Sequence, residues 1–183
     1  MKATLLLTIL CTLALCTPGQ AQKYEREERV QPEDLPQAVL IYLEKAYPQR
    51  SRVRHYRELS RSGGQEELQL FFESKFRDEG WYYSVKFDSL GQLYDTERII
   101  RPGHLPDEVE EKIEEDLGGY FQRYRIQKIQ ERLEEDGSVL GYEIVLRGKH
   151  NRSIGYYELQ YDAAGTRLYC EPIEQSPNPF FFF

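Results

Sequence analysis

The sequence predicts an α+β protein made of two tandem repeats, each a helix followed by a four-stranded antiparallel sheet, with the helices packed on one sheet face. Two internal similarities carry this prediction. Leu35–Val39 (Leu-Pro-Gln-Ala-Val) recurs as Leu105–Val109 (Leu-Pro-Asp-Glu-Val). Residues 82–91 recur as residues 156–165, and both segments read Tyr-Tyr-polar-apolar-polar-aromatic-Asp-x-x-Gly. The order and spacing of the two elements agree, so we interpret the chain as a duplication.

A helix opens each predicted repeat. Pro36 and Pro106 suit the first helical turn, where the missing N–H of proline does no harm. Apolar residues then recur with helical spacing and mark one buried face. We expect Pro48 to end the first helix and Gly118-Gly119 to end the second. The buried positions predicted in this way are Val39, Leu43 and Tyr47 in the first helix, and Val109, Ile113 and Leu117 in the second.

Strands follow each helix. In both Tyr-Tyr segments apolar and polar residues alternate, which is typical of a strand with one buried face. The alternation predicts that Tyr83, Val85 and Phe87, with Tyr157, Leu159 and Tyr161, face the helices. The Asp-x-x-Gly endings predict turns, in which Asp88 and Asp162 accept local hydrogen bonds. The remaining predicted strands cover 51–60, 67–76, 93–100, 120–133, 140–147 and 168–173, with turns at Ser62-Gly63-Gly64 and Asp136-Gly137.

The first 21 residues resemble a secretory signal peptide. Lys2 precedes the apolar run 5–15, and Gly19-Gln20-Ala21 provides a small-x-small cleavage site. We therefore expect an exported protein, periplasmic or extracellular, that is cleaved after Ala21. Lipidation at Cys11 or Cys16 is an alternative, although leucine precedes both cysteines. A mature chain from Gln22 keeps only Cys170, so it forms no internal disulfide.

These features divide the chain into five predicted parts. Residues 1–21 are the signal peptide, 22–34 a charged mobile spacer, 35–101 the first repeat, 102–175 the second repeat and 176–183 an aromatic tail. The tail ends in four phenylalanines, and exposed aromatic residues of this kind favour association. It can dock in a groove, engage a partner or stay disordered, and the sequence does not rank these alternatives.

Composition limits the functions open to the chain. The net charge is −7, so the protein has no overall attraction for phosphate, and we expect no nucleic-acid partner. With 30% charged residues we expect no membrane-spanning body. His55, His104 and His150 are too scattered for a helical metal site and are expected at the surface or in turns. No nucleophile elbow, phosphate loop or paired-cysteine motif occurs. We therefore predict no catalytic residue, no metal site and no cofactor.

The helix opened by Leu-Pro-x-x-Val and the strands that end in an aromatic-Asp-x-x-Gly hairpin resemble the PepSY-like proteins. These are exported bacterial domains grouped with the β-lactamase-inhibitor-protein-like fold. The similarity covers about residues 35–172 in two tandem copies. The copies differ at two places: Gly155 takes the position in the second copy that Trp81 has in the first, and the second helix lacks the Tyr47-Pro48 ending of the first. The resemblance implies helices packed on one face of an antiparallel sheet. For the inhibitors it further implies that a partner enzyme binds the other face.

Binding is the function that we predict. Tyr82 and Tyr156 should point away from the helices, and Trp81 is the largest contact residue available. Aromatic residues interleaved with Arg and Lys are favoured at the centres of protein interfaces. We therefore predict that Trp81, Tyr82 and Tyr156 bind another envelope or secreted protein on the open sheet face, and that the protein recognises or inhibits it. The alternatives are that these tyrosines simply pack along a half-exposed sheet, that they bind a carbohydrate, or that the protein is an envelope hydrolase.

Overall fold

A computed structural model of the chain describes residues 24–61 and 67–173. Within these residues the chain forms nine strands, two α-helices and one short 3-10 helix. The predicted signal peptide, the aromatic tail and the turn at 62–64 lie outside the described residues. The elements are β1 (Tyr24–Val30), η1 (Pro32–Asp34), α1 (Gln37–Ala46), β2 (Ser51–Arg61), β3 (Gln69–Asp78), β4 (Trp81–Asp88), β5 (Leu93–Ile100), α2 (Asp107–Tyr120), β6 (Arg123–Leu133), β7 (Val139–His150), β8 (Ser153–Asp162) and β9 (Arg167–Ile173).

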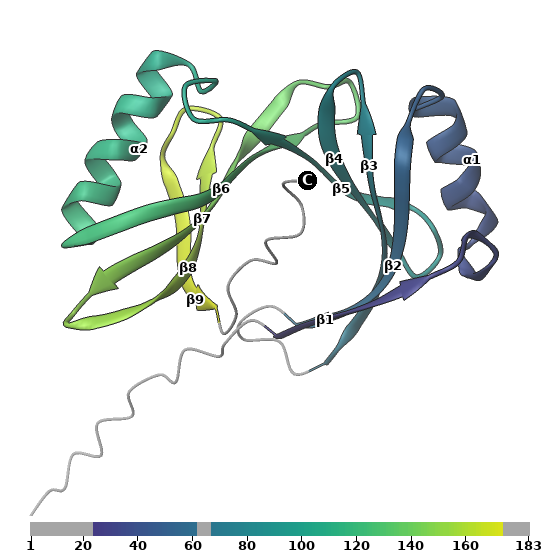
Figure 1. The fold of residues 1–183 in the computed structure, drawn as a ribbon, viewed down its shortest axis with the longest axis horizontal. Coiled ribbons are helices and arrows are strands. Elements are labelled where there is room, and N and C mark those ends of the chain that lie inside the picture. The colour runs from purple at the N-terminus through teal and green to yellow at the C-terminus, as the bar shows by residue number, and fades with distance from the viewer. Residues whose placement is uncertain (1–23, 62–66, 174–183) are drawn as a thin grey trace, which may run out of the picture.

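All nine strands belong to one antiparallel sheet, in which every strand pairs with its neighbours in chain order from β1 to β9. The sheet is bent into an arch, and the two helices lie on its outer side (Figure 1). The prediction of two repeats, each with a four-stranded sheet of its own, is therefore wrong. The strands that follow α1 and those that follow α2 are parts of a single continuous sheet.

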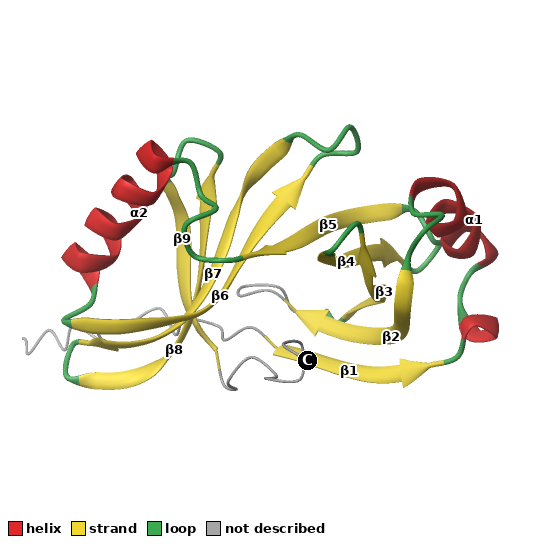
Figure 2. Cartoon of the chain, turned by 45° about the horizontal axis from the view of Figure 1, so that its top comes forward, coloured by secondary structure: helices red, strands yellow, loops and turns green. Residues whose placement is uncertain are grey.

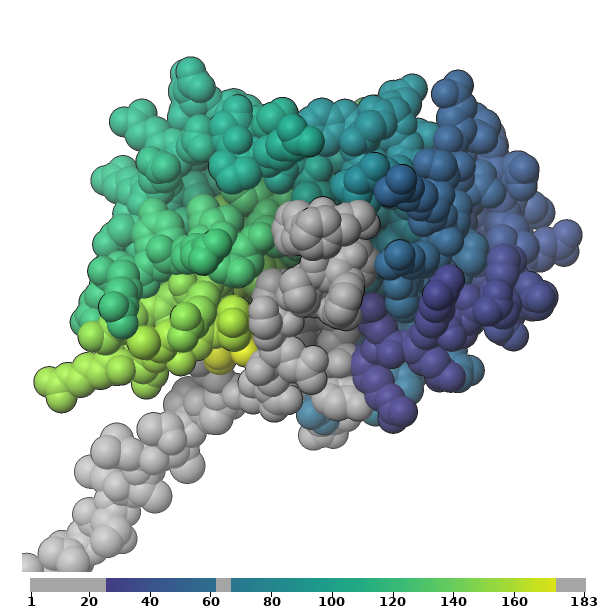
Figure 3. Space-filling view, viewed as in Figure 1, coloured from purple at the N-terminus to yellow at the C-terminus, as the bar shows by residue number. Residues whose placement is uncertain are grey.

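The pairing of β5 with β6 makes the sheet continuous. Glu97 to Ile100 of β5 lie opposite Arg132 to Ile129 of β6. Two separate sheets would leave both strands as edges with unpaired backbone N–H and C=O groups, and pairing them removes both edges. We call the part of the chain from β1 to β5 the α1 flank and the part from α2 to β9 the α2 flank. In the space-filling view the middle of the chain joins these two flanks along the upper side of the molecule (Figure 3).

The segment 24–30 also departs from the prediction. It forms β1 and pairs along its whole length with β2, from Tyr24 opposite Arg61 to Val30 opposite His55. We expected a mobile spacer because charged residues dominate this segment. An edge strand tolerates this composition, since charges on an edge discourage further strand addition.

Helix α1 covers the part of the sheet formed by β3 and β4, at one end of the molecule (Figure 2). Val39 and Leu43 on its inner face and Val85 and Phe87 on β4 are completely buried. The predicted apolar positions of this helix therefore contact the predicted inner face of the strand. The cluster consists of Leu35, Val39, Leu43, Phe72, Phe76, Val85 and Phe87.

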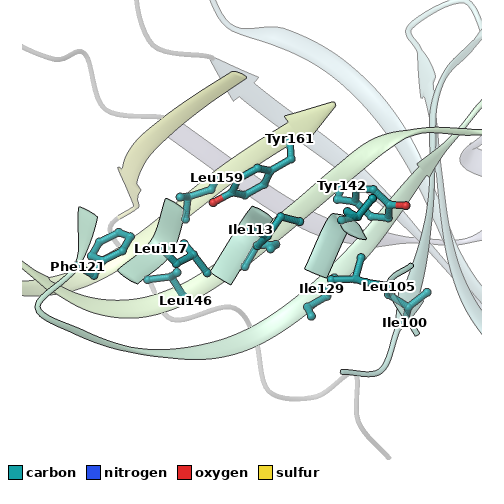
Figure 4. Close-up of a cluster of buried hydrophobic side chains, with 12 residues drawn as sticks. Ile100, Leu105, Ile113, Leu117, Phe121, Ile129, Tyr142, Leu146, Leu159 and Tyr161 are labelled. Carbon is teal, nitrogen blue, oxygen red and sulfur yellow. The ribbon is translucent and has the colours of Figure 1, made fainter. Parts of the chain in front are cut away.

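Helix α2 covers the other end in the same way, over β6, β7 and β8. Ile113 and Leu117 pack onto Leu146, Leu159 and Tyr161, which are all at most 1% exposed (Figure 4). The hydroxyl group of Tyr161 donates a hydrogen bond of 2.9 Å to Asp116 on the helix. The inward orientation predicted for the two Tyr-Tyr segments is thus confirmed, because Val85, Phe87, Leu159 and Tyr161 are core residues.

The Asp-x-x-Gly turns form as predicted. Oδ1 of Asp88 accepts hydrogen bonds from the backbone N–H groups of Leu90 and Gln92, each at 2.9 Å. Asp162 repeats the arrangement with Ala164 and Thr166. These aspartates hold the turns between β4 and β5 and between β8 and β9, and local hydrogen bonding accounts for them without catalysis.

The predicted end of the second helix is wrong, because α2 continues through Gly118 and Gly119 to Tyr120.

No helix among the described residues is long and apolar enough to cross a membrane.

Candidate functional site on the concave face

The sheet has two faces of different character. Both helices pack on the outer face, and we call the other one, inside the arch, the concave face (Figure 1). Since side chains alternate along each strand, the neighbours of the core residues point to the concave face. On β4, for example, Val85 and Phe87 face α1, so Tyr82, Ser84 and Lys86 lie on the concave face. The polar and aromatic residues placed there include Tyr56, Glu58, Glu73, Lys75, Tyr82, Lys86, Glu97, Lys128, Gln130, Glu143, Tyr156 and Glu158.

Tyr82 and Tyr156 are on the concave face, on strands of the two different flanks. Both side chains are half-buried. The guanidinium group of Arg77 stacks on the ring of Tyr82, 4.1 Å from its centroid. The hydroxyl group of Tyr82 is buried and has no hydrogen-bond partner among the described residues. Tyr156 lies directly opposite Arg147 across β7 and β8. The structure therefore places both tyrosines on the concave face, and their role in binding stays a prediction.

Trp81 lies on the other face, contrary to the expected position on the open side. Its indole ring packs against the hydrophobic cluster under α2. It also meets His104 edge-on, at 5.6 Å between ring centroids, and Arg98 at 5.2 Å. The reason is the period of the strand, because residue 81 shares its face with Tyr83. Trp81 thus joins the two flanks of the molecule and does not belong to the concave face.

Buried charges occupy the middle of the concave face on the α1 flank. Glu58 is completely buried and Glu73 is 5% exposed. The ammonium group of Lys86 lies 2.9 Å from Oε2 of Glu58. That of Lys75 lies 2.8 Å from Glu73 and 2.6 Å from Glu27. Burial of a charge is costly unless it is paired, and here β1, β2, β3 and β4 each contribute to the pairing.

The electrostatics of Glu73 follow from this network. Burial alone would raise the pKa of the carboxyl group, but the ammonium groups of Lys75 and Lys86 and hydrogen bonds from Lys75 and Ser84 lower it to about 2. Burial opposes the charged form of Lys75, but the carboxylates of Glu73 and Glu27 raise its pKa above the usual value. Both groups are therefore charged over the whole physiological pH range.

Glu27, Glu58 and Glu73 have carboxylate oxygens within 4.8 Å of one another, which is a spacing that could hold a metal ion. The two lysine ammonium groups lie against the same oxygens and already supply positive charge there. We therefore interpret the cluster as an ion-pair network that fixes the relative positions of the four strands.

A second polar cluster lies where β5 joins β6 and β7. The side-chain amide of Gln130 donates a 2.7 Å hydrogen bond to Glu97, and Lys128 lies 3.2 Å from Glu143. Burial and the nearby carboxylate of Glu143 raise the pKa of Glu97 to about 8, while Lys128 opposes the shift. Glu97 is thus largely protonated at neutral pH and lowers the negative charge at the centre of the face.

Sequence reasoning missed this polar interior. The sequence analysis singled out none of Glu58, Glu73, Glu97 and Glu143, because nothing in a single sequence shows that such residues meet cross-strand lysines in the folded sheet. The available signal was the placement of lysines at alternate positions of neighbouring strands, as in Lys75 and Lys86. The sequence analysis missed an aromatic pair as well. The ring centroids of Phe71 and the exposed Tyr94 lie 4.7 Å apart.

The three histidines are separated from the concave face. His55 is buried on the outer face with Nδ1 2.9 Å from the hydroxyl group of Ser74, so the expectation of a surface residue is wrong for it. Its burial lowers its pKa. His104 contacts Trp81, and His150 stacks on Tyr120 at 4.1 Å between ring centroids. Cys170 is half-buried on β9 against the α2 cluster and forms no disulfide.

Comparison with known structures identifies the fold class. A BLIP-like protein from Bacteroides fragilis superimposes with a TM-score of 0.52 and 16% identity, over 78% of this chain and 89% of that chain. A DUF2874 family protein from Bacteroides ovatus matches with a TM-score of 0.55 and 16% identity, over 80% and 96%. A DUF2874 family protein from Bacteroides uniformis gives 0.54 and 14%, over 75% and 89%.

These likenesses show that the chain has the BLIP-like fold, which confirms that part of the resemblance seen in the sequence. The similarity to PepSY-like proteins stays a prediction. No family model matches the chain, and no curated protein sequence matches it either.

Proposed function

We propose that this chain is an exported, non-enzymatic protein that binds another envelope or secreted protein through its concave face. The observation that carries the proposal is that both helices pack on the outer face, which leaves a broad sheet surface with half-buried tyrosines on each flank. Tyrosines among Arg and Lys side chains are the residue types that supply binding energy at protein interfaces. The ion-paired clusters on the same face hold the strands in place, so little ordering is needed on binding.

The BLIP-like fold supports the proposal by analogy, since the Bacteroides fragilis protein is described as BLIP-like. Export is part of the proposal because of the leader in the sequence. Its test is the mass of the secreted chain, which should begin at Gln22 without a lipid group.

The binding test begins with affinity capture from an envelope extract and identification of the retained protein. The dissociation constant of the purified partner is then measured for the wild type, Tyr82→Ala and Tyr156→Ala. We expect each variant to stay folded and to lose at least tenfold in affinity. The matched control is Ile41→Ala, because Ile41 is an exposed apolar residue on α1, away from the concave face. Full affinity in both tyrosine variants would show that the concave face is not the site.

A further inference from the structure

Four basic residues lie together at the end of the sheet formed by the start of β6 and the end of β7. Arg125 is directly opposite Arg147, and Arg123 is directly opposite Lys149. We call these four residues the cationic corner. The arginines are exposed and Lys149 is half-buried. Both cross-strand pairs join like charges, which destabilise a sheet when they stand opposite each other.

The cationic corner is on the concave face. Ile126 and Leu146 pair with each other and pack into the cluster under α2, so they point to the outer face. Their neighbours Arg125 and Arg147 therefore point to the concave face. Tyr156 on β8 pairs with Arg147 and has the same orientation. The corner thus lies beside one of the tyrosines assigned to partner binding.

The charges of the corner are not neutralised within the described part of the chain. No carboxylate there forms an ion pair with Arg123, Arg125, Arg147 or Lys149, whereas Lys75, Lys86 and Lys128 on the same face each contact one. The whole chain carries a net charge of −7, so acidic residues to pair them are not scarce. A cluster of unpaired cations in an acidic protein has an electrostatic cost that a negatively charged partner would remove.

We propose that the cationic corner, together with Tyr156, binds a short acidic segment of a partner protein. The inference rests on the proposed function and specifies the chemistry of the partner. Two cross-strand pairs on adjacent strands cover about 5 Å by 7 Å at the backbone, which suits two or three carboxylates. The planar guanidinium groups of the arginines pair with carboxylates through two parallel hydrogen bonds.

An acidic protein segment fits better than nucleic acid. Farther along β7 and β8 the concave face carries Glu143 and Glu158 rather than further cations, so the positive surface ends at the corner and cannot follow a continuous line of phosphates. A peptide can place its carboxylates at the corner and uncharged residues beyond it. The acidic outer side of α2 in a second copy is another source of carboxylates, with Glu108, Glu111 and Glu115 exposed. That contact would be heterologous and would build open-ended assemblies, so the test includes it as an outcome.

The test uses the full mature chain and a random twelve-residue peptide library as the probe. We expect the wild type to select peptides at least threefold enriched in Asp and Glu, often beside an aromatic residue. The variant Arg125→Glu/Arg147→Glu should lose this enrichment and bind the best peptide at least tenfold more weakly. The control is Lys45→Glu/Arg101→Glu, which changes the net charge equally at exposed sites outside the cationic corner and should retain affinity within twofold.

The inference fails if the wild type shows no acidic enrichment, or if the wild type and the corner variant select the same peptides. Displacement of the peptide by a short oligothymidylate at lower concentration would indicate nucleic acid instead. Self-association of the wild type that the corner variant abolishes would indicate a second copy of the chain. The result is separable from the proposed function. If a captured partner is lost in Tyr82→Ala but held at full affinity by Arg125→Glu/Arg147→Glu, the acidic-segment inference fails and the binding function stands. If the wild type captures no partner yet selects acidic peptides through the corner, the proposed function fails and the acidic-segment inference stands.

Discussion

Glu97 is the residue whose ionisation should most affect stability near neutral pH. Its pKa rises from an ordinary value of 4.5 to about 8 in the folded protein, because of burial and the neighbouring Glu143. Between these values the folded chain binds a proton that the unfolded chain has released. Stability contributed by this group is therefore complete below about pH 4.5 and is lost as the pH rises toward 8.

Glu97→Gln should remove this loss. The amide has the shape of the protonated carboxyl group and needs no charge on the concave face. We expect the unfolding free energy of the variant, relative to that of the wild type, to grow by about 3 to 4 kcal/mol from pH 5 to pH 8, since each pH unit between the two pKa values costs the wild type about 1.4 kcal/mol. Urea unfolding at both pH values measures it. Glu115→Gln, at an exposed position on α2, is the control and should give parallel curves. A wild type that gains stability from pH 5 to pH 8 relative to Glu97→Gln would contradict the assignment.

Tyr82 and Phe87 test the assignment of the two faces on a single strand. Phe87 is completely buried under α1 and contacts Tyr42 edge-on at 5.4 Å. Phe87→Ala should therefore cost about 3–5 kcal/mol of unfolding free energy. Tyr82 is half-buried on the concave face, and Tyr82→Ala should cost only about 1 kcal/mol. Thermal or urea melts of both variants decide the matter, and equal losses would mean that the register is wrong.

At the scale of the elements, the glycines at the end of α2 illustrate what propensity alone cannot decide. Gly118-Gly119 is a typical stop signal, but the helix continues because Leu117 is completely buried and the N–H of Phe121 donates to its carbonyl oxygen at 2.8 Å. Tertiary packing here outweighs the entropy cost of two helical glycines.

Gly118→Ala should consequently stabilise the protein. A methyl group at this position meets no atom within 4 Å, and the helical backbone suits alanine, so we expect a gain of about 0.5–1 kcal/mol in unfolding free energy. Gly91→Ala is the contrasting variant. It lies at a φ of +83°, and a Cβ there would come within 3.0 Å of Pro36, so it should destabilise the protein by about 1 kcal/mol or more. Urea melts measure both, and a loss of stability in Gly118→Ala would show that the end of α2 is strained.

The sequence predicted local features better than it predicted their assembly. The inner faces of both helices, the inward positions Val85, Phe87, Leu159 and Tyr161, and the turn aspartates were predicted correctly, because period and turn chemistry are local properties. The continuity of the sheet was not, since the pairing of β5 with β6 leaves no local mark. For the candidate site, alternation placed Tyr82 and Tyr156 correctly, and it also shows in retrospect that Trp81 belongs to the outer face.

At the scale of the whole molecule, the contacts between β5 and β6 decide whether the two flanks are independent. Across this junction Arg98 lies 2.5 Å from Glu131, Gln130 donates to Glu97, and Arg132 lies 3.2 Å from Asp95. Trp81 begins β4 and yet packs against the cluster under α2. Backbone pairing, ion pairs and an aromatic contact thus join the α1 flank to the α2 flank, and a partner on the concave face would meet one rigid surface.

This continuity predicts a single cooperative unfolding transition. Trp81 is the only tryptophan, so its fluorescence reports on the junction, while far-UV circular dichroism reports on the whole sheet. We expect the two signals to coincide in urea, as two-state unfolding requires. Leu43→Ala on α1 and Ile113→Ala on α2 should each lose about 2–5 kcal/mol and shift both signals equally. Two separate transitions, with Leu43→Ala moving only one of them, would mean that the flanks fold as independent units despite the shared sheet.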